Sequence, residues 1–499
     1  MGHVPRVAGV LTMVGVAAVF ALTSIPSAQT LSLLDAVKSG NREAVRVSLN
    51  GHPNVNAHDV DGTTALHWAV RGDDVETVRA LVRAGANVNV ANRYGVTPLS
   101  LAAANGARAI AADLIAAGAD VGTSTPGGET VLMTAAHTGN ADVVNLLLEH
   151  GADVSAREHE FGETALMWAA AENHAAAVTV LATHGADLNA RATVLQYPNV
   201  KVDAATMVIT AMPRGGLTPL MYAARQGSID SARALVEAGA ALNATDPDGM
   251  SALVIAIINA HYDVAQMLVA KGADPNVADV TGMAAVYAAV DMHTLDPLVN
   301  RPAPTGNTSH AAVDLVAALL EHRADSNQTL KSPLLARQHN FGDATLGAGA
   351  TPLMRAARSG DVAMMEVLLA HDANARQAMP SRMTPLLFAV TPSRRKSARD
   401  ALEAAKLCLD HGADVNAKDA SGSAPLHLAV ALSDDLVRLL VERGARLDVT
   451  DQAGRTPLDV AMGIGVEGRG RGGRGAGPVV RETTAALLRE LGARSGVAR

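Results

Sequence analysis

Aromatic residues and cysteine are scarce in this chain. Only 2% of its 499 residues are Phe, Trp or Tyr, and Cys408 is the only cysteine. A large globular enzyme usually fills the centres of its core with aromatic rings. The composition instead favours a structure in which many Ala, Leu and Val side chains make small, repeated contacts. A single thiol also excludes an internal disulfide and a zinc site built from several cysteines.

A strong charge of one sign is also lacking. The chain has 41 basic and 49 acidic residues, for a formal net charge of −8. This balance provides no global basic field of the kind that binds nucleic acid, so no nucleic-acid partner is expected. The sequence also lacks a nucleophile elbow, an H-E-x-x-H zinc motif, a P-loop and a dinucleotide-binding glycine pattern in the required context. We therefore predict no catalytic residues and no cofactor.

The first residues have the order of a secretory signal peptide. Arg6 supplies a positive charge, residues 7–22 form an uncharged apolar run, and small residues follow at Ser27 and Ala28. The run is shorter than the ~20 residues that a spanning helix needs. We therefore predict that residues 1–28 are a signal peptide, cleaved after Ala28, with an uncleaved anchor as the alternative. The mature chain is then exported to the periplasm or secreted, with no transmembrane segment.

One nine-residue motif recurs along the chain, for example as GTTALHWAV, GVTPLSLAA and GRTPLDVAM. Its third residue falls at Thr64, Thr97, Thr130, Thr164, Thr218, Ser251, Ala284, Thr351, Thr384, Ala424 and Thr456. The commonest step between these positions is 33 residues, and the long steps are this period plus an insertion. A fixed period of this length indicates a repeat architecture.

Each repeat predicts a helix–turn–helix unit. Thr or Ser caps a first, Ala-rich helix such as residues 165–171, and Pro fits the next position. A Gly/Asn break precedes a second, amphipathic helix such as ADVVNLLLEHG, in which Val144 and Leu148 have helical spacing. The glycine of HGAD, for example Gly151, is expected to end this helix in the left-handed conformation. One pair cannot bury its apolar face alone, so neighbouring pairs should stack.

This pattern resembles the ankyrin repeat, whose T-P-L-H-x-A signature it carries. The resemblance implies an all-α fold, an ankyrin-repeat α-solenoid of about 11–12 stacked helix–turn–helix units with short hairpin loops. Residues 29–60 are interpreted as an N-terminal capping repeat. Residues 481–499 are interpreted as a C-terminal capping helix, with Arg489, Glu490 and Arg494 turned outward. The ankyrin repeats themselves are expected at 61–191, 215–327 and 348–462.

Insertions interrupt the 33-residue frame. Two of them, 192–214 and 328–347, fall between one unit and the next, where the resemblance places the hairpin fingers that border the groove. Three others, near 293–309, at 391–398 and at 463–480, fall between the two helices of a unit. The last is rich in Gly and Arg, and Arg469, Arg471 and Arg474 are candidate contacts for a polyanion. Since no aromatic or extended basic context surrounds them, a solvated loop is the favoured interpretation.

The middle of the array departs from the repeat pattern. Ala284 and Arg323 replace the expected Thr and Gly in one unit, and Asp372 replaces Gly in the next. Together with the neighbouring insertions, these changes predict a loosened region between residues 290 and 350.

Most histidines and the large rings follow the repeat frame. His150, His184 and His411 precede a capping glycine, and His67 and His427 occupy the H of T-P-L-H. Histidines on successive units lie one helix-packing distance apart, so they are expected to cap helices or bond between repeats rather than to bind metal. Trp68, Trp168, Tyr222 and Phe388 share one helix position and predict packing between repeats. Cys408 takes a core position and is expected to be buried and inert.

The resemblance implies a non-catalytic scaffold that binds another protein along a groove. Contacts in ankyrin repeats come from the turn and from the end of the first helix. By position, the candidates are Arg93, Tyr94, His137, Phe161, Glu163, Glu172, Arg225, Gln226, Asn259 and Arg358. Aromatic and Arg residues are enriched at interface hot spots. The alternatives are polyanion binding through the Gly/Arg-rich segment and, least favoured, an enzyme with its site in an insertion.

Overall fold

The computed structural model describes residues 31–195, 215–294, 308–332, 345–393, 396–464 and 480–496. These residues form helices joined by turns, and the only β-pairing among them is a set of isolated bridges. They fall into two compact units that divide between Thr193 and Val194. The prediction of an all-α repeat fold is confirmed.

Unit 1 contains five helix pairs within the described residues up to Thr193. The pairs are α1 (Leu33–Lys38) with α2 (Arg42–Asn50), α3 (Ala65–Arg71) with α4 (Val75–Arg83), α5 (Pro98–Asn105) with α6 (Arg108–Ala116), α7 (Val131–His137) with α8 (Ala141–Glu149), and α9 (Ala165–Ala171) with α10 (Ala175–Thr183).

Unit 2 contains seven pairs within the described residues from Val194 onward. The pairs are α11 (Pro219–Gln226) with α12 (Ile229–Glu237), α13 (Ala252–Ile258) with α14 (Tyr262–Ala270), α15 (Ala285–Thr294) with α16 (Thr308–Glu321), α17 (Pro352–Ser359) with α18 (Val362–Ala370), α19 (Pro385–Val390) with α20 (Ala398–Asp410), α21 (Pro425–Ala429) with α22 (Asp434–Glu442), and α23 (Pro457–Ala461) with α24 (Glu482–Glu490).

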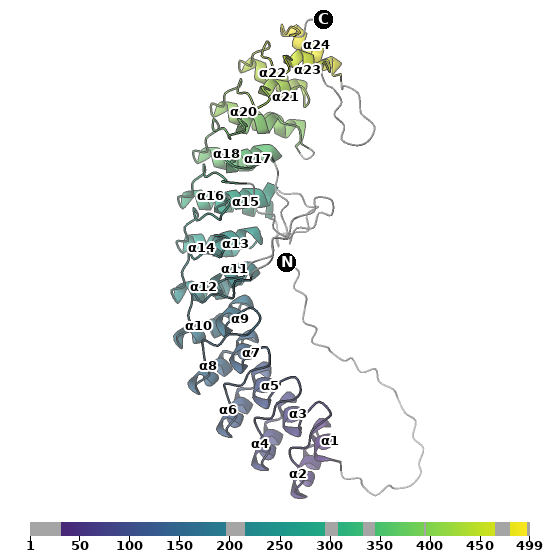
Figure 1. Ribbon diagram of the computed structural model, residues 1–499, viewed down its shortest axis with the longest axis vertical. Coiled ribbons are helices and arrows are strands. Elements are labelled where there is room, and N and C mark those ends of the chain that lie inside the picture. The colour runs from purple at the N-terminus through teal and green to yellow at the C-terminus, as the bar shows by residue number, and fades with distance from the viewer. Residues whose placement is uncertain are drawn as a thin grey trace, which may run out of the picture. The chain divides into compact units, whose positions relative to one another are not determined.

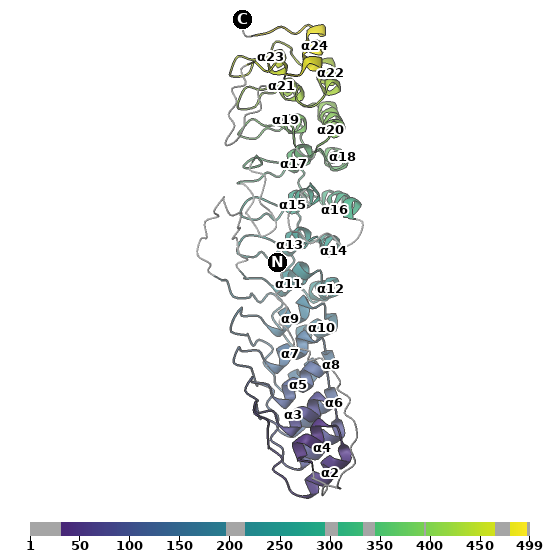
Figure 2. The same ribbon diagram turned by 90° about the vertical axis from the view of Figure 1, so that its right-hand side faces the viewer.

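Within each unit the helices form two layers. Each odd-numbered helix packs on its even-numbered partner and on the next odd-numbered helix. The two rows are visible in Figure 1 and, side by side, in Figure 2, where the turns project beyond the odd-numbered row. We call the odd-numbered helices the inner helices and the turns before them the fingers. The surface that these two parts expose is the one on which the predicted contact residues fall.

The expected caps start the inner helices. The Thr130 side chain accepts a hydrogen bond from the backbone N–H of Met133 at 3.2 Å, and Pro98 takes the first position of α5. A cap of this kind contributes about 1 kcal/mol. Gly151 ends α8 with φ 89°, as predicted for the glycine of HGAD. The leucine two residues after the cap is almost fully buried in ten units: Leu66, Leu99, Leu132, Leu166, Leu220, Leu253, Leu353, Leu386, Leu426 and Leu458.

A single side chain closes most fingers. Asn92, five residues before the cap, accepts hydrogen bonds from the backbone N–H groups of Tyr94 and Val96 at 3.0 and 3.1 Å. The same closure is made by Asp246, Asp279, Asp419 and Asp451. The finger before Thr164 is one residue longer, and there the longer Glu158 takes this role. Because these donors are satisfied locally, the fingers hold fixed conformations.

The histidines stabilise the array, as predicted. His67 joins two repeats, because its Nε2 lies 3.0 Å from the Val96 carbonyl oxygen, and His427 bonds in the same way to the Arg455 carbonyl. His150 and His184 instead bond through Nδ1 to the carbonyl four residues earlier in their own helices, at 2.9 Å each. Within the described ranges, no group of three or more His, Cys, Asp or Glu side chains could hold a metal ion.

The described helices within residues 290–350 pack on their neighbours, and the predicted loosening of this region stays a prediction. Helix α15 packs on α17, and α16 packs on α14 and α18. Asp291 on α15 accepts a hydrogen bond from Arg355 Nε on α17 at 2.8 Å, and both side chains are 8% exposed. His293 also bonds to Asp361, just before α18. The glycine replacements Arg323 and Asp372 keep the left-handed conformation.

The C-terminal pair is closed by a buried carboxylate. Asp459 takes the position of the signature histidine and is fully buried. Burial by itself would raise the pKa of Asp459, but hydrogen bonds from Ser495, Thr456 and Gly496 lower it below its usual value. Helix α24 turns Arg489 and Glu490 toward solvent, as predicted for a cap.

Candidate functional site

The first inner helices of unit 1 build a charged aromatic cluster around Trp68. Lys38 at the end of α1 and Arg71 at the end of α3 both lie 5.4 Å from a ring centroid of Trp68. The indole N–H donates to Asp59 at 3.0 Å, and Lys38 forms an ion pair with the same carboxylate at 2.6 Å. The hydrogen bonds from Lys38 and then Trp68 hold the pKa of Asp59 below its usual value. The ring is therefore fixed by its neighbours.

Two predicted contact residues are exposed aromatic side chains on fingers. Tyr94 is 57% exposed, and the Arg93 guanidinium lies 4.7 Å from its ring centroid and bonds to its hydroxyl. Phe161 is 39% exposed, although its backbone is held at both ends. Its N–H donates to Glu158 at 2.7 Å, and its carbonyl accepts from the N–H of Thr193 at 2.7 Å. Each finger thus presents an aromatic group from a rigid backbone.

His137 and Trp168 form a second cluster in the same unit. The His137 ring, at the end of α7, meets the Trp168 ring edge-on, with centroids 5.4 Å apart and an angle of 73°. Trp168 is half-buried, and its Nε1 is the single buried side-chain nitrogen or oxygen without a partner among the described residues. Trp68 has Asp59 as its acceptor, whereas Glu158 at the corresponding finger is occupied by backbone N–H groups.

The two predicted acids of unit 1 differ in exposure. Glu163 is half-buried, and its N–H donates to Glu158 at 3.0 Å. Glu172 follows the last residue of α9 and is exposed. Both lie beside the inner helix that carries Trp168, so they belong to the same surface as Phe161.

Most of the predicted contact side chains of unit 2 interact with neighbouring groups of the protein itself. Arg225 lies 4.7 Å from the ring centroid of Tyr222, and the neighbouring Gln226 is exposed. The Asn259 side chain donates to the Ile255 carbonyl of its own helix at 2.8 Å. Arg358 donates to the Pro392 carbonyl at 3.4 Å. Of these four side chains, Gln226 is the most open.

The shared aromatic position is used for packing, as expected, but to different degrees. Phe388 is 1% and Tyr222 is 6% exposed, so both belong to the core. Trp68 and Trp168 are half-buried and border the surface of unit 1. At this helix position, the rings of unit 1 are therefore partly accessible, whereas those of unit 2 are buried.

Two buried reactive groups lie in unit 2. Cys408 is fully buried in α20, and burial raises its pKa to about 12, as expected for an inert thiol. The Lys396 ammonium donates to the carbonyls of Phe388 at 2.6 Å and Ala357 at 3.4 Å, the C-terminal ends of two inner helices. Burial, followed by the charge of Arg358, lowers the pKa of Lys396 to about 7.

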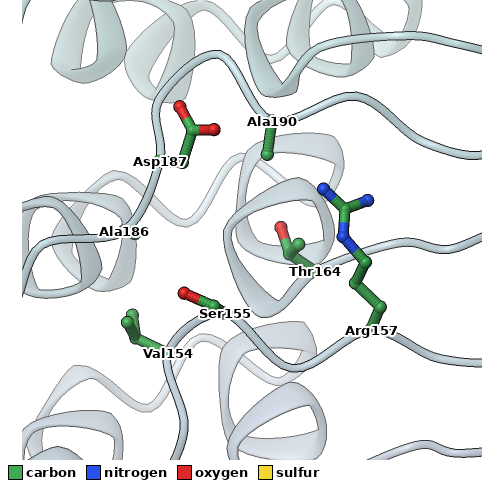
Figure 3. Close-up of a pocket in the computed structure, with 7 residues that line it drawn as sticks. All are labelled: Val154, Ser155, Arg157, Thr164, Ala186, Asp187 and Ala190. Atoms are coloured by element: carbon green, nitrogen blue, oxygen red, sulfur yellow. The ribbon is translucent and has the colours of Figure 1, made fainter.

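A small pocket in unit 1 lies between the finger before α9 and the turn that follows α10. Its volume is about 120 Å³, and Figure 3 shows Arg157 and Asp187 on opposite sides of Thr164. One nitrogen of the Arg157 guanidinium donates to the carbonyls of Gly162 and Arg191 at 2.8 and 2.6 Å. Arg157 therefore stabilises the finger.

A larger cleft occupies the corresponding place in unit 2. It has a volume of about 460 Å³ and lies between the finger before α19 and the turn before α21. Three cationic side chains line it, Arg376, Arg382 and Lys418, together with the single acid Asp414. No sequence motif marks this set, since its members come from two fingers of successive repeats and meet only in the folded array.

Some predictions concern residues outside the described ranges. These are the signal peptide at 1–28, Arg469, Arg471 and Arg474 of the Gly/Arg-rich segment, and most of the insertions at 192–214 and 328–347. The first of these insertions is flanked by a bridge between Val194 and Gly215. No helix in the described part of the chain is long and apolar enough to cross a membrane.

These features define a helical-repeat protein whose fingers and inner-helix ends are exposed together. A family model for ankyrin repeats in three copies matches residues 33–125, 102–192, 200–279, 309–419 and 395–465. The chain therefore belongs to the ankyrin-repeat family, and its repeats indicate a protein–protein interaction scaffold.

Comparison with solved structures adds the crystal structure of the human ASB11 ankyrin repeat domain. It is 24% identical, with a TM-score of 0.39, over 48% of this chain and 96% of that chain. Comparison with curated proteins gives no significant match.

Proposed function

We propose that this chain is a non-catalytic scaffold that binds another protein through the inner helices and fingers of unit 1. The observation that carries the proposal is the pair of exposed aromatic side chains, Tyr94 and Phe161, on fingers whose backbones are held by internal hydrogen bonds. Aromatic side chains dominate binding energy at interfaces, and a rigid finger loses little conformational entropy on association.

The surroundings of these rings support the same proposal. Arg93 fixes the Tyr94 ring, and the cluster of His137 with Trp168 extends the aromatic surface onto the inner helices. Glu163 and Glu172 place carboxylates on this part of unit 1. A partner that covers the rings and offers cationic groups to these acids fits both features.

Affinity capture tests the proposed surface. The bait is the chain from residue 29 onward, and the sources are envelope and secreted extracts. A Tyr94→Ala/Phe161→Ala bait should lose the partner, with each truncation costing about 2 kcal/mol if the ring is a hot spot. A Val47→Ala bait is the matched control, because Val47 is 50% exposed on the outer helix α2. Equal capture by all three baits would refute the proposed surface.

We also propose that the protein acts after export. The support is the order of charge, apolar run and small residues at the N-terminus. Fractionation of the native host, followed by N-terminal sequencing, tests this. The expected product begins at Gln29 and lies in the envelope or the medium, whereas an intact N-terminus in the cytoplasmic fraction contradicts export.

A further inference from the structure

The cleft of unit 2 combines its size with an unbalanced charge. Its volume of about 460 Å³ is in the range of sites that hold small ligands or a few side chains of a partner. One wall is the finger before α19, which contributes Arg376 and Arg382. The other is the turn before α21, which contributes Asp414 and Lys418. The lining thus carries three cations and one carboxylate, although the whole chain is acidic.

The three cations are not neutralised within the described residues. Arg376 Nε donates to the Gly412 carbonyl at 2.7 Å, and Lys418 Nζ donates to the Thr450 carbonyl at 2.8 Å. These bonds orient both side chains but leave their charges and further N–H groups available. Asp414 does not form an ion pair with any of them, and its carboxylate accepts from the N–H of Asn416 at 2.9 Å.

Arg382 is the most informative of the three. It occupies the finger position that is Gly62, Gly95 or Gly422 in other repeats, and it keeps their left-handed conformation with φ 64°. This conformation costs a non-glycine residue about 1–2 kcal/mol. The side chain is exposed and forms no hydrogen bond or ion pair within the described ranges. The backbone N–H of Arg382 donates to the Met379 carbonyl at 2.7 Å, so the turn is held while the guanidinium stays available to a ligand.

We propose that this cleft binds an acidic peptide segment of a partner protein. Guanidinium groups bind carboxylates in a two-pronged geometry, and the ammonium of Lys418 adds a point charge. Since the cations come from separate segments, a ligand with several carboxylates satisfies more of them than a single small anion. The site lies in unit 2 and uses no residue of the Tyr94 and Phe161 surface.

Fluorescence anisotropy on the full chain tests this site. The probe is a short fluorescein-labelled peptide of alternating Glu and Ser, and the same peptide with Gln for Glu should not bind. The Arg382→Gly/Lys418→Met variant should bind at least about tenfold more weakly, which corresponds to about 1.4 kcal/mol. Arg382→Gly also removes the backbone strain, and urea unfolding of the double variant checks that loss of the Lys418–Thr450 bond leaves the fold intact.

Matched variants make each outcome decisive. Arg399→Gln/Lys406→Gln removes two exposed charges from α20 that do not line the cleft, and should change affinity by less than about twofold because solvent and salt screen such charges. Tyr94→Ala/Phe161→Ala should leave probe binding unchanged, which separates this site from the proposed function. Failure of the wild type to bind, or equal weakening by both charge variants, would overturn the proposal. Pyrophosphate that displaces the probe at the peptide's own affinity would also overturn it, in favour of a small-anion site.

Discussion

Arg323 and Asp372 offer a direct test of how strongly the repeat pattern constrains the backbone. Both follow an outer helix at a position where most units have glycine, and they adopt φ values of 67° and 62°. The Arg323 carbonyl accepts from Asn276 Nδ2 at 2.9 Å, just as the Gly118 carbonyl accepts from Asn89 Nδ2 at 2.9 Å. The bond between repeats thus forces the glycine conformation on a residue with a side chain.

Replacing either residue by glycine should therefore stabilise the protein. The left-handed conformation costs about 1–2 kcal/mol for a residue with a β-carbon. Glycine also increases the conformational entropy of the unfolded chain, which offsets about 0.4–1 kcal/mol of the stabilisation. Both side chains are exposed and make no hydrogen bond or ion pair within the described residues, so little else is lost. The net gain is about 0.5–1 kcal/mol for each of Arg323→Gly and Asp372→Gly.

Urea unfolding followed by circular dichroism, with native-state hydrogen exchange of α16 and α18, measures this gain. Ala238→Gly is the matched control, since Ala238 is exposed at the end of α12 but has φ −76°. There glycine should destabilise by about 0.5–1 kcal/mol. The reasoning fails if Arg323→Gly and Asp372→Gly lower stability, or if Ala238→Gly raises it.

Three further predictions follow from buried groups of unit 2. Asp291→Asn should destabilise by about 3–5 kcal/mol in urea unfolding, because it leaves Arg355 charged and buried, and Asp291→Leu/Arg355→Met should recover most of this loss. Lys396 has a lowered pKa in the folded protein, so between about pH 7 and 10.5 it is deprotonated there but protonated in the unfolded chain. The free energy of unfolding of the wild type should therefore rise with pH relative to that of Lys396→Met. The same pH dependence in both proteins would contradict this. Cys408 should react with a thiol reagent only after unfolding, and rapid labelling of the native protein at pH 8 would show that it is accessible.

The repeating part of the fold could be predicted because its causes are local and recur. The Thr130 cap, the glycine after α8 and the signature His67 each act within one unit or on its neighbour. The recurrence of these residues at a fixed period in the sequence therefore predicts these interactions. The interpretation of Cys408 succeeded for the same reason, since its place in the frame is one that other repeats fill with leucine.

Features that do not repeat were missed. Asp291 and Arg355 are separated by two insertions and pair across two inner helices, so no spacing relates them. The cations of the unit 2 cleft come from two fingers, and a count of charges along the chain gives no sign that they converge. Departures from the pattern are visible in the sequence at Arg323 and Asp372, but their backbone conformation is not. In the structure both residues keep the left-handed conformation of the glycines that they replace.

Asp459 also bears on how this protein could be lengthened or shortened. In an internal repeat, the signature histidine bonds to the next finger, as His67 does to the Val96 carbonyl. A repeat inserted after it could accept the same bond. Asp459 instead holds the chain's own Ser495 and Gly496, and the contact of Gly496 with Thr456 leaves no room for a side chain. Asp459 therefore ties α23 to the segment after α24, and exchange of repeats should be tolerated better among the internal repeats than in this one.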